Sequence, residues 1–582
     1  MLDYYGPMTL PKRLRFPTLL LAMALFVPSG WAQTESPANS ELNSSLMYEL
    51  LLAEISANNG DAGSAYQLML DAAQKSRSDQ LFERAVEIAL NARSGESALQ
   101  AAQAWNRAAP GSKDAQRYLL QILIGLNKLP ETVEPIRREL AGLPLKERLQ
   151  AINLLPRYFV RASDKTLAAK TVEQALSPEL ARNTTGPVAY AAIGTMRLLA
   201  GDPEAALSAA TKGAALNPKA EEPVQLAMEL MGSKLTGAEA LVTRHLSLDA
   251  SPELRLTYVR KLLEMQRYAD AQTQVLQLTA AAPAFAAGWL VQGSLFMEAK
   301  QLPQAQSALE KYLALKTAAE TGDSAQTDRG LTQAYFLLAQ IAEQNQHPDV
   351  AEAYLARISS PQDAVRVQSQ RAGILAQQGK LDEARALIRA TPESQPEDAR
   401  AKISAEVQLL RDHKQFEQVY EVLQQAHLAN PADTDLQYDL AMAAEKLNKI
   451  AEMESLLRQV IANKPDYHQA YNALGYSLAD RKIRLPEARE LIQKALEFAP
   501  HDPFIMDSLG WVEFRSGNLT QAQQILQAAY QSKPDPEIAA HLGEVLWSLG
   551  EQAQARSVWQ QGASQNPDNE TLRETMQRLG TP

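Results

Sequence analysis

The final third of the sequence repeats itself with a period close to 34 residues. Between Tyr467 and Asp568 a Leu-Gly pair stands at this spacing three times, at 474–475, 509–510 and 542–543, and each of these pairs is followed first by an alanine and then by a proline. Together with two earlier prolines, the closing positions are Pro431, Pro465, Pro500, Pro534 and Pro567. A fixed period of this length predicts a helix–turn–helix unit that stacks on copies of itself, and therefore an all-α fold.

Small residues occupy set places in each terminal unit. Glycine in a helix interior is unfavourable, so its recurrence indicates close packing of the two helices of a hairpin. We therefore expect the three Leu-Gly glycines to lie opposite the recurring alanines: Gly475, Gly510 and Gly543 opposite Ala488, Ala522 and Ala555. Gly517 and Gly550 are predicted to end the first helix of their units.

These positions resemble the tetratricopeptide repeat (TPR) family, most clearly over residues 397–568. The resemblance implies a right-handed superhelical solenoid of TPR-type helical hairpins. The terminal block also resembles a group of Gram-negative envelope TPR proteins, with matching text at residues 471–481, 507–511, 539–547 and 567–569. Members of that group bind a carboxyl-terminal processing protease and present cell-wall hydrolases to it.

The rest of the chain divides by how clearly it shows the repeat. Residues 42–396 read as divergent TPR-like helical hairpins, and 397–568 as a regular array. Residues 569–582 are predicted to form a capping helix and tail, because an open solenoid end needs a polar cover. Residues 316–331 are rich in polar residues and predict an exposed loop or hinge. The span 392–396 suggests a second joint.

The N-terminus has the pattern of an export signal. Three basic residues precede a twelve-residue apolar run, Phe16 to Val27, and small residues follow at Gly30 and Ala32. This pattern predicts a signal peptide over 1–32, with translation starting at Met1 or Met8, and a disordered lead-in over 33–41. The periplasm is the expected location. Because the chain has no cysteine, an outer-membrane lipid anchor is not expected, and any membrane association would be indirect.

Composition argues against several kinds of chemistry. The net charge is −11, which disfavours nucleic-acid binding. No histidine pair has the i, i+4 spacing of helical metal ligands. Residues 373–380 resemble a phosphate-binding loop, but the spacing between their glycines is one residue too long. We expect no cofactor, no metal and no catalysis. An enzyme with its site in 140–190 or 316–331 remains the least favoured alternative.

The first helices of stacked TPRs line the inner surface, where a partner would bind. Counting from the Leu-Gly positions, the predicted protein-binding residues are Asn472, Tyr476, Asp507, Trp511, Phe514, Glu544 and Trp547, beside the small Ala479 and Ala540. Aromatic side chains carry much of the energy at interfaces. Tyr476 and Trp511 are expected to be the more exposed, whereas Phe514 and Trp547 could equally be half-buried against a neighbouring helix.

These features predict a non-catalytic protein-interaction scaffold of the cell envelope. Following the resemblance, its partners would be a carboxyl-terminal processing protease and cell-wall hydrolases. A scaffold for envelope polysaccharide export or pilus assembly is the alternative. The sequence leaves the partner's identity and the oligomeric state open.

Overall fold

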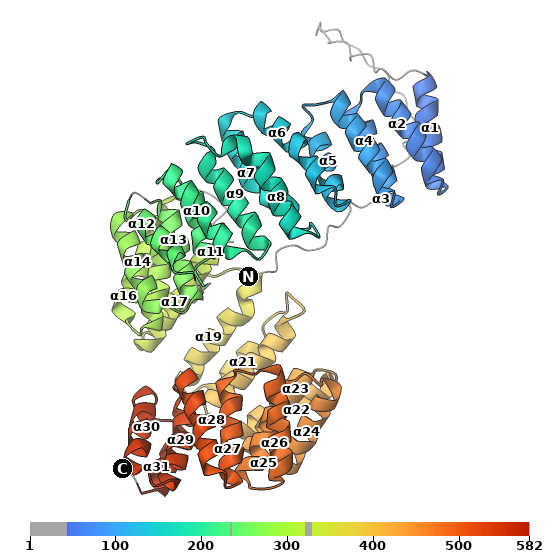
Figure 1. The fold of residues 1–582 in the computed structure, drawn as a ribbon. Coiled ribbons are helices and arrows are strands. Elements are labelled where there is room, and N and C mark those ends of the chain that lie inside the picture. Colours follow the sequence, from blue (N-terminus) through green and yellow to red (C-terminus); the bar gives the residue numbers. More distant parts are fainter. Residues whose placement is uncertain (1–43, 233–234, 249, 320–328, 581–582) are drawn as a thin grey trace, which may run out of the picture. The chain divides into compact units, whose positions relative to one another are not determined.

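The computed structural model describes residues 44–232, 235–248, 250–319 and 329–580, and all regular secondary structure in these ranges is helical (Figure 1). The predicted signal peptide over 1–32 and lead-in over 33–41 lie outside the described residues. The chain divides into two compact units, and the boundary in the sequence falls between Leu254 and Arg255. None of the helices in the described part of the chain combines the length and apolar character needed to span a bilayer.

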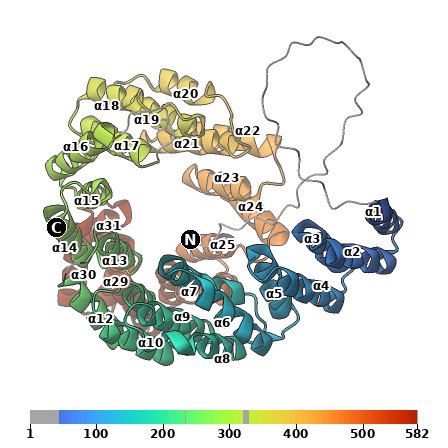
Figure 2. The ribbon, with the colours of Figure 1, turned by 90° about the horizontal axis from the view of Figure 1, so that it is seen from above.

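The first unit is a row of short helices that lie side by side along a curve (Figure 2). Consecutive helices pair through tight turns. Its helices are α1 (Ser44–Asn58), α2 (Ala62–Ser76), α3 (Asp79–Asn91), α4 (Gly95–Ala108), α5 (Lys113–Gly125), α6 (Val133–Gly142), α7 (Leu145–Phe159), α8 (Lys165–Leu176), α9 (Gly186–Leu199), α10 (Pro203–Leu216), α11 (Glu222–Glu229) and α12 (Gly237–Leu246), with short 3₁₀ turns at Leu129–Thr132 and Ser177–Glu179.

Local sequence explains where these hairpins turn. Gly60 has φ +82° after α1, and Asp61 then caps α2 by accepting a hydrogen bond from the Ser64 backbone. Since glycine adopts positive φ at no steric cost and aspartate favours N-caps, Gly-Asp ends one helix and starts the next. The same Gly-Asp pair separates α9 from α10, where Asp202 accepts from the Ala205 backbone.

The second unit contains the regular array. α13 (Pro252–Glu264) crosses the boundary between the units. The helices that follow are α14 (Tyr268–Ala281), α15 (Ala286–Glu298), α16 (Leu302–Ala319), α17 (Arg329–Gln344), α18 (Pro348–Leu355), α19 (Ala364–Gln377), α20 (Leu381–Arg389), α21 (Asp398–Asp412), α22 (Phe416–Ala429), α23 (Thr434–Lys446), α24 (Ile450–Asn463), α25 (His468–Asp480), α26 (Leu485–Phe498), α27 (Pro503–Arg515), α28 (Leu519–Ser532), α29 (Pro536–Ser548), α30 (Gln552–Gln565) and α31 (Glu570–Arg578), with one further 3₁₀ turn at Pro361–Asp363.

From α23 to α30 the units are uniform: the first helix of each hairpin has 13 residues and the second has 14. The predicted close approach at the three Leu-Gly glycines is present, but only Gly475 meets the predicted alanine, Ala488; Gly510 meets Leu526 and Gly543 meets Trp559, each one helical turn after the recurring alanine. A Cβ atom on Gly543 would lie 2.0 Å from Nε1 of Trp559, and one on Gly475 would lie 2.9 Å from the Ala488 carbonyl oxygen. Only glycine lets the two helices approach this closely. Gly517 and Gly550 have φ +89° and +86° just beyond α27 and α29.

Two predicted loops are shorter or firmer than expected. The prediction of a loop over 316–331 is wrong at both ends. Helix α16 continues to Ala319, and α17 already begins at Arg329. The remainder of the predicted loop, 320–328, lies outside the described residues. The connection between α20 and α21 is not helical, but the buried Asp398 carboxylate accepts hydrogen bonds from the backbone N–H groups of Ser394 (2.6 Å) and Gln395 (2.9 Å). This connection is therefore tied to the start of α21.

The outermost helices of the described chain differ in character. A helix, α31, lies where the sequence predicts a capping helix, and its sequence is polar apart from Leu572 and Met576. By contrast, α1 leaves five large apolar side chains between 38% and 68% exposed: Met47, Tyr48, Leu51, Leu52 and Ile55.

Candidate functional site

The first helices of the terminal units, α25, α27, α29 and α31, lie in a row, each in contact with the next. We call the surface that they share the terminal inner face. Tyr476, Trp511 and Glu544 occupy equivalent places on it, each one residue after a close-packed glycine. The repeat thus brings residues one period apart in sequence to neighbouring places on one surface.

A buried histidine lies at the centre of the terminal inner face. Nδ1 of His541 lies 2.8 Å from Oδ2 of Asp507, and its Nε2 lies 3.3 Å from the hydroxyl of Tyr476. The imidazole also stacks on Trp511, with ring centroids 4.2 Å apart. The indole Nε1 of Trp511 donates to Oδ1 of Asp480 at 3.2 Å. Three successive first helices, α25, α27 and α29, therefore meet around one imidazole.

The protonation of His541 is set by its carboxylate neighbours. Burial alone would lower the pKa of the imidazole, but the charge and hydrogen bond of Asp507, helped by Glu537 and Glu544, outweigh burial and raise it. Burial raises the pKa of Tyr476 well above its usual value, and four surrounding carboxylates act in the same direction: Glu537, Asp480, Asp507 and Glu445. The terminal inner face is therefore acidic around Tyr476.

The expectation that Trp511 is exposed is wrong, since only 4% of the residue is accessible. It is buried because the ring lies against His541 on one side and against Phe514, with centroids 5.1 Å apart. Tyr476 is only half-buried. Trp511 thus forms the floor of the inner face rather than a free contact surface.

The other predicted site residues fall into two groups. Asp507 and Glu544 are buried, whereas Asn472, Phe514 and Trp547 are half-buried. Glu544 forms a paired contact with Arg578 on α31, at 2.9 and 2.5 Å, and so holds the capping helix in place. Trp547 lies against Trp559 of the neighbouring helix α30, with ring centroids 5.7 Å apart. It is therefore half-buried in a helix contact, which was the alternative to an exposed position.

Two buried acceptors on this face have no hydrogen-bond donor among the described residues. They are Oδ1 of Asn472 and Oδ1 of Asp507. A buried acceptor left without a donor is unfavourable. Both atoms belong to residues that the sequence assigned to partner binding, but both are buried and therefore out of reach of a partner on the surface.

The stretch that resembles a phosphate loop has a structural role. Residues 373–380 run from the interior of α19 into its C-terminal turn, where Gly379 has φ +79° and the Lys380 N–H donates to the Leu375 carbonyl. This is a helix end, not a phosphate loop. Within the described ranges, no three or more His, Asp or Glu side chains are grouped so as to hold a metal ion.

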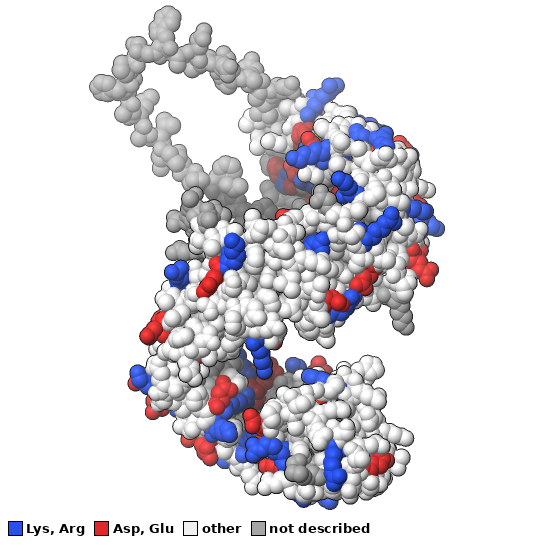
Figure 3. Space-filling model, turned by 90° about the vertical axis from the view of Figure 1, so that its left-hand side faces the viewer, with Lys and Arg blue, Asp and Glu red and all other residues white. Residues whose placement is uncertain are grey.

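Positive charge is not gathered into a stripe on the face shown in Figure 3, where Lys and Arg alternate with Asp and Glu. Nucleic-acid binding usually depends on a concentrated basic surface. This face offers none, in keeping with the net charge of −11.

The fold defines a helical-repeat protein, and comparison with known proteins identifies the repeat. A family model described as tetratricopeptide repeat matches residues 259–321, 336–399, 421–503 and 508–570, so the chain contains TPRs. The TPR repeat-containing protein PA4667 of Pseudomonas aeruginosa is 38% identical over 202 residues, which are 35% of this chain and 34% of that protein. The match thus spans about a third of the relative's length.

Solved structures resemble parts of the chain. A tetratricopeptide repeat protein from Parabacteroides merdae covers 42% of this chain and 98% of its own, with 13% identity and a TM-score of 0.34. MamA from Desulfovibrio magneticus RS-1 covers 29% of this chain and 95% of its own, with 16% identity and a TM-score of 0.25. At these TM-scores neither structure bears on function.

Proposed function

We propose that the protein is a non-catalytic adaptor of the cell envelope, which binds a carboxyl-terminal processing protease and presents substrates such as cell-wall hydrolases to it. The TPRs indicate a protein-interaction scaffold. The observation that carries the finer proposal is the terminal-block text at residues 471–481, 507–511 and 539–547, which resembles that of envelope adaptors of this kind.

The terminal inner face supports a binding role of this type. It is built on a rigid floor, with Trp511 and His541 buried and stacked. Around that floor lie the half-buried Tyr476 and Glu537 and the exposed Asp480. A pre-organised surface loses little conformational freedom when a partner binds, so its contacts contribute more fully to affinity. The acidic surroundings favour a partner segment that carries basic groups.

Affinity capture from an envelope extract tests the proposal. The full chain should recover a carboxyl-terminal processing protease together with cell-wall hydrolases. Asp480→Asn, which removes an exposed charge on the terminal inner face but keeps an Oδ1 acceptor for the Trp511 indole, should recover less protease. The matched control Asp466→Asn, in the exposed turn before α25, should recover as much as the wild type. Recovery of polysaccharide-export or pilus components in place of the protease would favour the alternative scaffold role.

The proposed periplasmic location rests on the N-terminal sequence pattern. Export and cleavage after Ala32 would leave Gln33 as the first residue of the mature protein. N-terminal sequencing of the protein from the periplasmic fraction tests this directly. An intact N-terminus on protein found only in the cytoplasm would overturn the location and the envelope role together.

A further inference from the structure

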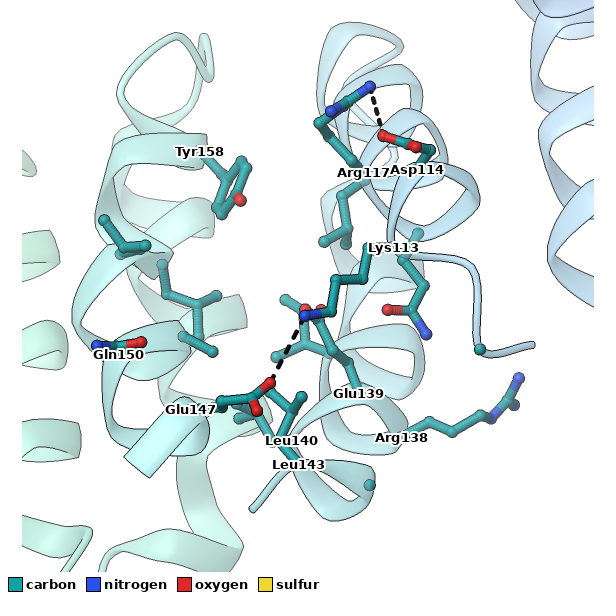
Figure 4. Close-up of a pocket in the computed structure, with 18 of the residues that line it drawn as sticks. Lys113, Asp114, Arg117, Arg138, Glu139, Leu140, Leu143, Glu147, Gln150 and Tyr158 are labelled. Atoms are coloured by element: carbon teal, nitrogen blue, oxygen red, sulfur yellow. Dashed lines mark ion pairs between the residues drawn. The ribbon is translucent and has the colours of Figure 1, made fainter. Parts of the chain in front are cut away.

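A second candidate binding site lies in the first unit, between α5 and α7 (Figure 4). A cavity of about 580 Å³ opens there. It coincides with an irregular hairpin: the helix after α5 has only 10 residues and follows a 3₁₀ turn that begins Leu129-Pro130, whereas the second helices of the terminal units have 14. The short α6 lines the cavity together with α5 and α7. The volume lies within the range of ordinary ligand pockets.

The floor of the cavity is apolar. Buried leucine and isoleucine side chains from α5, α6 and α7 form its base: Leu120, Ile136, Leu140 and Leu155. Leu154 and Tyr158 stand at its edge, one helical turn apart on α7, and are 40% and 39% exposed. An apolar side chain entering the cavity would cover both, and burial of such surface is the main source of affinity at protein interfaces.

The charges at the rim are unevenly paired. Arg117 lies 2.8 Å from Asp114, and Lys113 lies 3.6 Å from Glu147, as the dashed lines in Figure 4 show. Among the described residues, the side-chain carboxylate of the half-buried Glu139 forms neither an ion pair nor a hydrogen bond. Burial raises the pKa of its carboxyl group, although the charge of Lys113 acts against this. Arg138, the remaining cation, is directed away from α7 (Figure 4).

We propose that this cavity binds a segment of a partner protein in which a large apolar side chain stands next to a lysine or arginine. The apolar side chain occupies the floor beside Leu154 and Tyr158, and the cation pairs with the Glu139 carboxylate. A charge-assisted bond of this kind supplies the partner that Glu139 lacks. The inference does not depend on the identity of the protease, since it concerns a different unit from the terminal inner face.

Short labelled peptides test the proposal on the full chain by fluorescence anisotropy. The probes are acetylated Gly-Ser-Phe-Lys-Ser-Gly amide and its analogues with Gln or Glu in place of Lys, or Gly in place of Phe. The Phe-Lys peptide should bind most tightly. Glu139→Gln should weaken its binding by about fivefold while leaving the Phe-Gln peptide within about twofold, because only the charge contact is lost. Leu154→Ser should weaken the binding of both.

The matched control is Glu134→Gln on the same helix, an exposed carboxylate that does not line the cavity. It should bind all four peptides as the wild type does. Thermal melts of the variants separate binding from folding. Since burial disfavours the ionised Glu139, its replacement by Gln should not lower Tm.

Three results would overturn the proposal: equal affinity for the Phe-Lys and Phe-Glu peptides, no binding of any peptide, or a large fall in the Tm of Glu139→Gln. Sedimentation provides a fourth. If the wild type is a dimer and Leu154→Ser is a monomer, a second copy of the chain fills the cavity instead.

Discussion

Nδ1 of His541 lies 2.8 Å from Oδ2 of Asp507, and the two buried side chains join α29 to α27. Breaking a buried charge pair by removing one partner leaves the other without compensation. We expect Asp507→Asn to destabilise the terminal repeats by about 3 kcal/mol. The checks are chemical denaturation and the retention of helical circular dichroism in the rest of the chain. An unchanged midpoint would show that the pair contributes nothing.

The raised pKa of His541 predicts a definite pH dependence. A histidine whose pKa is higher in the folded state than its ordinary value of 6.5 stabilises the fold fully below that value. The contribution is lost as the pH rises through the raised pKa. The Tm difference between wild type and His541→Asn should therefore be larger at pH 6 than at pH 9. His501→Asn, at an exposed turn, is the control. A difference that grows with pH would contradict the assignment.

The burial of Trp511 predicts a stability effect before any binding effect. Trp511→Ala removes a ring that stacks on His541 and bonds Asp480, so we expect a loss of about 3–5 kcal/mol. Trp289, half-buried at the start of α15, is the comparison, and its replacement by Ala should cost clearly less. Denaturation midpoints of the two variants decide between these outcomes. If Trp511→Ala keeps full stability and loses only partner capture, Trp511 is a contact residue after all.

The close helix approach at Gly543 predicts opposite results for two glycine substitutions. A Cβ atom at Gly543 would meet the Trp559 ring at 2.0 Å, so Gly543→Ala should destabilise by about 2 kcal/mol or more. At Gly373, inside α19, the nearest atom is 3.8 Å away, so Gly373→Ala should stabilise by about 0.5–1 kcal/mol through helix propensity. Thermal melts of both variants test the packing directly.

The tie between Asp398 and the preceding backbone predicts protection of the α20–α21 connection. Asp398→Ala removes the acceptor for the N–H groups of Ser394 and Gln395. Residues 390–397 should then be cut faster by a broad-specificity protease, because local opening exposes the backbone. Glu397→Ala, at the neighbouring exposed position, should be cut at the wild-type rate if the tie is specific.

Much of the fold could be predicted from sequence because packing in a repeat is local. The Leu-Gly glycines and the recurring alanines indicate where the two helices of each hairpin pack closely. The repeat period indicates that the hairpins stack on one another. The burial of Trp511 could not be predicted in this way. It depends on a contact with His541. The local sequence around His541 shows only that this residue directly precedes a Leu-Gly pair, and gives no sign of a contact with Trp511. Its position 34 residues after Asp507 was the available signal.

The cavity between α5 and α7 was missed for a similar reason. A period detects units that match one another, whereas the cavity arises where a unit departs from the pattern. Pro130 and Pro135, which lie in the 3₁₀ turn and in the first turn of the short α6, were the available sign of a shortened helix. The size of the gap, however, depends on how far α7 stands from α5, and that distance is a tertiary property.

Tyr476 on α25 reaches His541 on α29, past the intervening α27. In a simple stack each unit touches only its neighbours, so units can fray one at a time from a free end. A contact that skips a unit prevents this one-by-one fraying. The Glu544–Arg578 pair ties the last helix, α31, to α29 and so includes it in the same linked group. The end of the chain should thus open in one step, with slow and uniform hydrogen exchange across α25, α27 and α29. The terminal inner face would therefore be either fully folded or fully open, and a partner would meet its complete acidic surface or none of it.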